Sequence, residues 1–145
     1  MTQAIELNGT TYRWPTKPVV VVCIDGGDPT YFEQGLSDGI LPNVQRFSKH
    51  GFSNIAEGVM PSYTNPNNMS IVTGAPQSVH GISGNYFFEP ETGQEHMMND
   101  PVFLRSETIL EKFSRAGAKV VAITAKDKLR RLLGRGLDFE NGCIN

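Results

Sequence analysis

The sequence predicts an α/β fold in which helices flank a mostly parallel sheet. Three apolar runs carry this prediction, namely VVVVCI at 19–24, FSNIAEGV at Phe52–Val59 and AKVVAIT at 118–124. Each run is followed by a helix-like segment, and strands that alternate with helices are typical of a parallel sheet. The first run is continuous and β-branched, which indicates a strand buried on both faces. We expect Cys23 to be a small buried residue within it.

The N-terminal half begins with a predicted hairpin, AIELNGTTYRW, because Asn8-Gly9 is a favoured two-residue turn between alternating strands. After the strand at 19–24, Asp28 can cap a short helix that Pro29 opens. A second helix, PNVQRFSKH, is expected to begin at Pro42 and to end before Gly51, with His50 at its C-terminus.

The second half is expected to contain three helices and a hairpin. Pro66 marks the start of the helix NNMSIVTG, and YFF pairs with EHMM around a turn at 90–93. SETILEKFSRAG is amphipathic, with Ser106 as its cap and Gly117 as its stop. The last helix, KDKLRRLLGRG, closes at Gly134. We therefore expect residues 1–145 to belong to a single α/β domain.

Composition excludes several classes of protein. The net charge is −2, so nothing overall attracts nucleic acid or an anionic membrane surface. The longest apolar run is much shorter than the roughly 18 residues that a membrane helix needs. The N-terminus resembles no signal peptide, so we expect a cytoplasmic protein with no nucleic-acid or membrane partner.

Polar side chains are expected to meet where the strands end. Asp25 follows the first strand, Thr64 follows the second, and Lys126 with Lys128 follows the third. Ligands of open α/β sheets bind beyond the carboxyl ends of the strands, so these groups suit an anion. Asp25, placed after six apolar residues, is expected to be partly desolvated and to need a cation beside it.

The stretch PSYTNPNN, which contains Thr64, stands at the predicted mouth of a helix. The first turn of a helix leaves N–H groups unpaired and attracts phosphate-like groups. A threonine hydroxyl there is a poor nucleophile unless a divalent metal activates it, and Asp25 offers a suitable oxygen ligand. The alternative is an ordinary capped turn rich in asparagine.

Three segments together, VVVVCIDGG, PSYTNPNNMSIVTGAPQSVHGISGN and VVAITAKDKLRRLLG, resemble the phosphonoacetate hydrolases of the alkaline phosphatase superfamily. The resemblance covers residues 1 to about 134. It implies an alkaline-phosphatase-like fold, two zinc ions and hydrolysis of phosphonoacetate to acetate and phosphate in phosphonate catabolism. Asp25 and Thr64 would ligate zinc, and Thr64 would be the nucleophile. Asn85 would orient a phosphonate oxygen, and Lys126 and Lys128 would grip the substrate carboxylate.

The same family pattern assigns no metal to His80, which we expect to hydrogen-bond its loop. Family members are much longer, and their further zinc ligands lie in DxxxH and DH motifs that this sequence lacks. We therefore expect an incomplete, N-terminal part of the domain that is inactive alone. A homodimer is left open, and the expected partner is a small phosphonate. Two alternatives remain: a phosphodiesterase or nucleotide pyrophosphatase of the same superfamily, which would share Asp25, Thr64 and Asn85, and a non-enzymatic anion-binding module.

Overall fold

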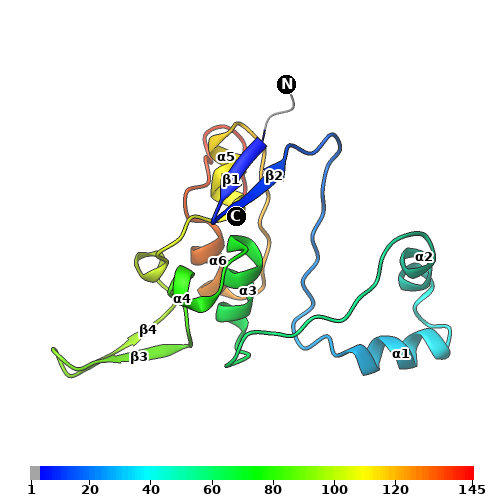
Figure 1. Ribbon diagram of the computed structural model, residues 1–145, viewed down its shortest axis with the longest axis horizontal. Helices are drawn as coiled ribbons and strands as arrows, with labels where there is room; N and C mark the ends of the chain where they lie inside the picture. Colours follow the sequence, from blue (N-terminus) through cyan, green and yellow to red (C-terminus); the bar gives the residue numbers. More distant parts are fainter. Residues whose placement is uncertain (1–3) are drawn as a thin grey trace. The chain divides into compact units, whose positions relative to one another are not determined.

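A computed structural model describes residues 4–145 of the chain. They form two compact units, which are described separately. The first unit combines the chain up to Lys17 with Gly58–Asn145, and the second is Pro18–Glu57. Figure 1 shows the elements of each unit in sequence colours.

The first unit begins with the predicted N-terminal hairpin. Strand β1 (Ala4–Leu7) pairs antiparallel with β2 (Thr10–Arg13), and Leu7 stands opposite Thr10. The turn residues Asn8 and Gly9 have φ angles of 49° and 80°. These are the left-handed conformations that a type I′ turn needs and that Asn-Gly adopts readily. The prediction of this hairpin is confirmed.

A second hairpin extends away from the helices of the first unit (Figure 1). It consists of β3 (Tyr86–Glu89) and β4 (Gln94–Met97), with Tyr86 opposite Met97, as predicted. On one face, Phe87 stacks on His96 at a centroid distance of 5.1 Å and meets Phe103 edge-on at 5.2 Å. These ring contacts fasten the base of the hairpin to the segment that follows it.

The other regular elements of both units are helical. The second unit holds α1 (Pro29–Ser37) and α2 (Pro42–His50). The first unit holds α3 (Thr64–Thr73), α4 (Gln77–His80), the 3₁₀ turn η1 (Pro101–Phe103), α5 (Ile109–Arg115) and α6 (Asp127–Leu133).

Two predicted caps have different outcomes. Asp28 caps α1 as expected, because its carboxylate accepts a hydrogen bond from the Thr30 N–H at 2.8 Å. The prediction for α5 was wrong. Thr108, and not Ser106, is its cap and accepts from the Glu111 N–H at 3.0 Å. The Ser106 hydroxyl instead donates to Asn8 Oδ1 at 2.9 Å and joins the N-terminal turn to this region.

The mostly parallel sheet is not formed by the described residues, whose two sheets are the antiparallel hairpins. Segments 19–24 and 52–59 contain no strand, and 118–124 contributes one parallel bridge, between Val121 and Ile144. Val20 is 83% exposed, and Cys23, predicted to be buried, is also exposed. A parallel strand is stabilised only by neighbours that lie far away in the sequence, and within residues 4–145 these runs have no such ladder.

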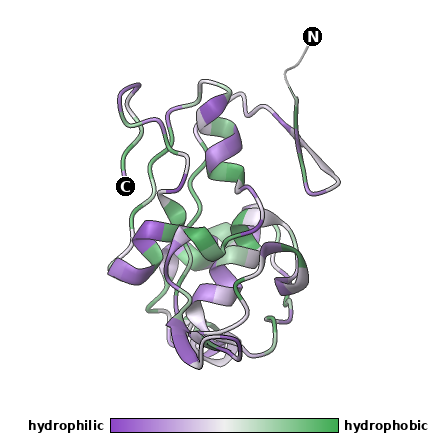
Figure 2. Cartoon of the chain, turned by 90° about the vertical axis from the view of Figure 1, so that its left-hand side faces the viewer, coloured by the Kyte–Doolittle hydropathy of each residue, from purple (hydrophilic) through white to green (hydrophobic). Residues whose placement is uncertain are grey.

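The core lies in the first unit. It consists of Met69, Ile82, Met98, Leu104, Ala122, Leu129, Leu132, Leu133, Leu137 and Cys143. Leu129, Leu132 and Leu133 recur at helical spacing and so form one apolar face of α6. Figure 2 shows the corresponding alternation of apolar and polar bands along the helices. Within the part of the chain that the structure describes, no helix is long and apolar enough to cross a membrane.

Candidate functional site

Helix α3 begins at Thr64, two residues before the predicted start at Pro66. The residue that precedes it, Tyr63, makes no side-chain capping hydrogen bond. Thr64 is therefore the first helical residue, and it is partly buried. The partial positive charge of a helix N-terminus is strongest at this position, where an anionic group is stabilised.

The asparagines after Thr64 bind backbone groups around this turn. Asn67 accepts a hydrogen bond from the Val59 N–H at 3.0 Å and donates to the Tyr63 carbonyl at 3.0 Å. Asn68 donates to the Thr64 carbonyl at 2.9 Å, and Asn65 makes a long contact of 3.5 Å with the Met98 carbonyl. The asparagines thus bind the backbone of the turn, as the alternative of an ordinary asparagine-rich turn also expects, although Tyr63 at the N-cap makes no side-chain capping bond.

Lys126 lies beside Thr64. Its Nζ donates a hydrogen bond to Thr64 Oγ1 at 3.1 Å. The two residues are 62 positions apart, and Lys126 directly precedes α6. The sequence-based prediction that this lysine and this threonine lie together is confirmed. Lys128 is exposed in the first turn of α6.

Asn85 directly precedes β3, and its side chain is exposed. Its carbonyl accepts a hydrogen bond from the Met98 N–H at 2.8 Å. Because the Met98 carbonyl faces Asn65 at 3.5 Å, the backbone of Met98 links the starts of β3 and α3. The binding of a phosphonate oxygen by Asn85 stays a prediction.

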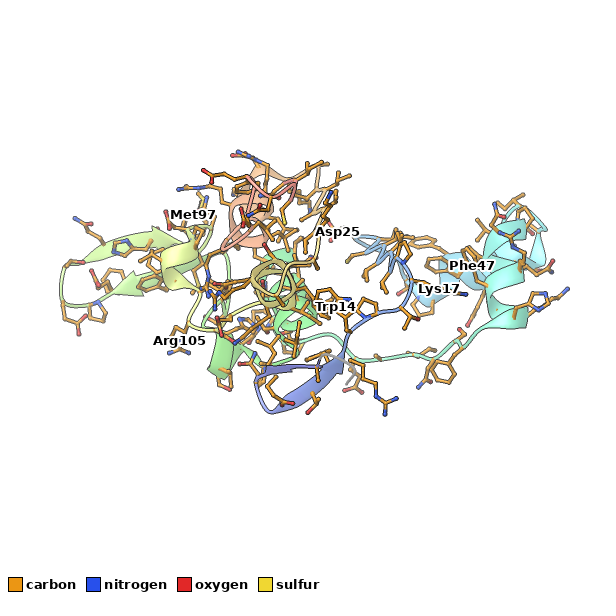
Figure 3. All side chains as sticks on the ribbon, turned by 90° about the horizontal axis from the view of Figure 1, so that it is seen from above. Trp14, Lys17, Asp25, Phe47, Met97 and Arg105 are labelled. Carbon is orange, nitrogen blue, oxygen red and sulfur yellow. The ribbon has the colours of Figure 1, made fainter. Side chains whose placement is uncertain are left out.

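Asp25 belongs to the second unit and lies on the extended segment that leads into α1 (Figure 3). It is itself part of a tight turn, in which the Gly27 N–H donates to the Ile24 carbonyl at 3.1 Å. Asp25 is exposed, so the expectation of a partly desolvated carboxylate was wrong. The apolar run before it is also exposed. Joint zinc binding by Asp25 and Thr64 stays a prediction.

No three histidine, cysteine, aspartate or glutamate side chains within residues 4–145 are grouped as a metal site would require. A zinc site in proteins usually has four ligands. Asp25 and Thr64 are too few, so the described residues do not form a zinc centre by themselves.

His80, the last residue of α4, supports α3. It is fully buried, its Nε2 lies 2.9 Å from Ser70 Oγ, and its Nδ1 accepts from the Ile82 N–H at 3.1 Å. Since Nδ1 is an acceptor, Nε2 carries the proton of the neutral ring and donates to Ser70. Burial, followed by the positive charge of Arg105, lowers the pKa of His80. The predicted loop-bonding role is confirmed.

Sequence analysis did not identify Ser70, and it suggested Asn67 only as one of several donors near Thr64. Ser70 is the partner of His80, and Asn67 bonds the backbone on both sides of the turn before Thr64. Asparagine in a polar stretch signals a turn, but nothing in the sequence tells which backbone groups its amide reaches. The contacts of Asn67 depend on how the loop at 58–63 folds, and that of Ser70 depends on how α4 packs against α3.

Solved structures include close matches to this chain. Two are crystal structures of phosphonoacetate hydrolase from Sinorhizobium meliloti 1021, in complex with phosphonoacetate and with phosphonoformate. Each matches with a TM-score of 0.95 and 49% sequence identity, over 99% of this chain and 35% of the hydrolase chain.

Curated relatives share lower identity. An uncharacterized pyrophosphatase/phosphodiesterase of Schizosaccharomyces pombe is 32% identical over 105 residues, which are 72% of this chain and 21% of the relative. The bis(5'-adenosyl)-triphosphatase enpp4 of Xenopus laevis is 33% identical over 86 residues, which are 59% of this chain and 18% of the relative. The chain thus spans about a fifth of the length of these relatives. The family described as type I phosphodiesterase/nucleotide pyrophosphatase matches residues 19–128, which is more than half of the sequence, and the chain belongs to this family.

Proposed function

We propose that this chain supplies the nucleophile and the carboxylate-binding lysines of a zinc-dependent hydrolase that splits phosphonoacetate into acetate and phosphate. The observation that carries the proposal is the hydrogen bond between Lys126 and Thr64 at the start of α3. The likeness to phosphonoacetate hydrolase over 99% of the chain supports it.

Thr64 is the proposed nucleophile. Its Oγ forms a bond to phosphorus as the P–C bond breaks, and the carbon departs with the bonding electron pair as the enediolate of acetate. Water protonates that carbon, and the hydroxide that remains takes up the proton released by the Thr64 hydroxyl. A second water molecule then hydrolyses the phosphothreonine to phosphate, which restores the hydroxyl. The ammonium of Lys126 beside Oγ1 stabilises negative charge on that oxygen before it attacks.

Lys126 and Lys128 also explain why a carboxylate-bearing substrate is proposed. A carbanion is a poor leaving group, but an attached carboxylate delocalises its charge. Negative charge on that carboxylate group grows in the transition state. Ammonium groups beside it therefore stabilise the transition state more than the ground state. In this proposal Asn85 binds a phosphonate oxygen.

Zinc is part of the proposal only for an assembly with more ligands than this chain supplies. Asp25 and Thr64 would be two of these ligands. Bound zinc would supply the positive charge that favours a deprotonated hydroxyl. The chain spans 35% of the solved hydrolase chains, and its described residues gather no metal-binding cluster.

A second candidate function is hydrolysis of a phosphodiester or pyrophosphate. The family match and the names of the two curated relatives favour it. Such an enzyme would use Thr64 and Asn85 in the same way but would have no carboxylate for Lys126 and Lys128 to bind. A non-catalytic anion-binding module would bind phosphate in the same way but would hydrolyse no substrate.

Ligand titration separates these functions. We expect the chain to bind phosphonoacetate more tightly than methylphosphonate, which lacks the carboxylate. Replacing both lysines, Lys126→Met with Lys128→Met, should reduce this preference by about 10-fold or more, since two ammonium partners are lost. Chemical shifts of the labelled chain report each affinity.

The control is Lys119→Met, which removes an exposed positive charge of the first unit elsewhere. It should leave the preference unchanged. If the lysine variant loses affinity for the two phosphonates equally, the lysines recognise the phosphonate and not the carboxylate. That result would favour the phosphodiesterase alternative.

A further inference from the structure

One side chain joins the two ends of the turn that leads into α3. The Asn67 amide oxygen accepts from the Val59 N–H, and its nitrogen donates to the Tyr63 carbonyl, both at 3.0 Å. The Asn67 backbone N–H also reaches the Tyr63 carbonyl, at 3.2 Å. Tyr63 therefore receives two hydrogen bonds from the same residue, directly before Thr64.

The backbone also packs closely against this amide. A Cβ atom added at Gly58 would lie 3.0 Å from Asn67 Oδ1, which is tighter than an ordinary contact. The hydrogen bond from Val59 is partly buried and therefore costly to leave unmade, whereas the one to Tyr63 is exposed. The turn has little room for a longer side chain or for a second position of the amide.

An amide is the group that this position needs. Val59 presents a donor and Tyr63 presents an acceptor, so the side chain between them must accept at one end and donate at the other. Ionised aspartate has the same shape but only accepts, so its second oxygen would face the Tyr63 carbonyl with like partial charge. Leucine has a similar size and makes neither bond.

Asn68 shows what an ordinary helix asparagine does here. It makes one hydrogen bond, to the Thr64 carbonyl at 2.9 Å, four residues back within its own helix. It does not hold the turn before the helix. Asn68 is therefore a matched control for Asn67.

We propose that Asn67 is a positioning residue that sets the location of the Thr64 hydroxyl by bridging Val59 and Tyr63. The inference rests on the proposed role of Thr64. Fixing Tyr63 fixes the peptide that leads into Thr64, and hence the direction from which its Oγ1 meets Lys126. A nucleophile held in this way needs less reorganisation to reach its substrate.

The variant Asn67→Asp tests this proposal, because a change of pH should reverse its effect. When the introduced carboxyl is protonated, it again has one donor and one acceptor, so it can restore both hydrogen bonds. When it ionises, the bond to Tyr63 is lost. The ionised form keeps the bond from the Val59 N–H and lies near the helix N-terminus, so we expect the carboxyl to titrate near the ordinary aspartate value of about 3.9.

The readout is the methyl signal of Thr64 in the labelled chain, assigned by its disappearance in Thr64→Ser. In Asn67→Asp, this signal should lie at its wild-type position at low pH and should move away as the carboxyl ionises. The wild type and Asn68→Ala, titrated in parallel, should lack that transition. A residue that only fills space would not make Thr64 follow the protonation of position 67.

The proposal would be overturned if the Thr64 methyl signal of Asn67→Asp did not change as the introduced carboxyl titrates. If that variant does not fold, amide exchange of the unsubstituted chain decides instead. The Val59 N–H should exchange slowly compared with its exposed neighbours, and an unprotected Val59 amide would also overturn the proposal. If Thr64 is not a nucleophile but Asn67 does position it, the methyl signal will still follow the titration. The experiment therefore distinguishes failure of the proposed function from failure of this inference.

Discussion

His80 is a buried histidine whose two ring nitrogens both have partners in the neutral form. Protonation would place a hydrogen on Nδ1, which now accepts from the Ile82 N–H at 3.1 Å, and would bury a charge near Arg105. Both effects penalise the charged ring, and burial, the larger cause, lowers the pKa of His80 below 6.5. The folded state therefore binds this proton less readily than the unfolded state does.

This difference predicts a pH dependence of stability. The contribution of His80 is fully present above the unfolded-state pKa of about 6.5 and is lost as the pH falls toward the lower folded-state pKa. The free energy of unfolding should decrease by at most about 1.4 kcal/mol per pH unit, which is the limit for one proton. Urea unfolding between pH 7.5 and 5 measures it.

The carboxylates contribute in a separate, more acidic window. Hydrogen bonds lower the pKa of Glu89, Glu107, Asp28 and Asp138, so their stabilisation is lost only as the pH falls below about 4.5. The variant His80→Gln should therefore remove the slope above pH 5 and leave the acidic one. An identical slope in His80→Gln would show that another group is responsible.

At the scale of elements, interactions between near neighbours in sequence were predicted and distant ones were not. The hairpin at Asn8-Gly9 and the cap at Asp28 depend on a few adjacent residues, and both are confirmed. The strand predicted at 19–24 depends on partners far away in the sequence, and among the described residues it has none. The apolar run indicates a buried strand, but it cannot specify what covers it.

The residues of the candidate site also differ in how well the sequence predicts their contacts. The position of Thr64 beside Lys126 was predicted because both follow apolar runs of the expected sheet. The bridge made by Asn67 could not be predicted, since its geometry depends on the loop conformation at 58–63. Asp25 lies in the separate second unit, so its part in the site stays a prediction.

Helix α5 is joined to the chain after α6 by a partly buried charge cluster. Glu111 is buried and pairs with Arg135, whose guanidinium also donates to the carbonyls of Leu104 and Ser106. Gly136 has a φ of +70°, and a Cβ there would overlap the Glu111 side chain. The close approach of Gly136 is therefore a condition for the cluster.

Two glycine substitutions test this packing. Gly93 in the β3–β4 turn has a similar φ of +68° but open space around it. Gly93→Ala should cost about 1–2 kcal/mol from left-handed backbone strain alone. Gly136→Ala should cost at least about 1 kcal/mol more, because Glu111 must move from Arg135. Equal losses in urea unfolding would show that Glu111 relaxes freely.

The whole chain combines a packed core with an exposed apolar segment. Val19, Val20, Val21 and Val22 are each at least 70% exposed, and Ile123 is 87% exposed. Such surfaces, with unpaired backbone groups, favour association with other strands. The chain aligns with 35% of the solved hydrolase chains, so we expect the same apolar runs to be covered in an assembly that contains the remaining strands.

Metal binding, like the covering of the apolar runs, should require parts of the fold that these residues do not supply. A neutral threonine is a weak ligand unless a metal is already held firmly enough to displace its proton. Since no cluster of three acidic, histidine or cysteine side chains exists among residues 4–145, the chain alone should bind zinc weakly and without a defined stoichiometry. Equilibrium dialysis with elemental analysis measures this, with Asp25→Asn as the comparison.

The same preparation should release no acetate from phosphonoacetate when zinc is added, although it should still bind the anion. We expect the helix terminus at Thr64 and the ammonium of Lys126 to attract the phosphonate, and neither group needs a metal for this. This affinity should fall as salt rises, because exposed charges are screened. Two tightly bound zinc ions per chain, or acetate release at an ordinary enzymatic rate, would contradict the ligand count and show that these 145 residues suffice for catalysis.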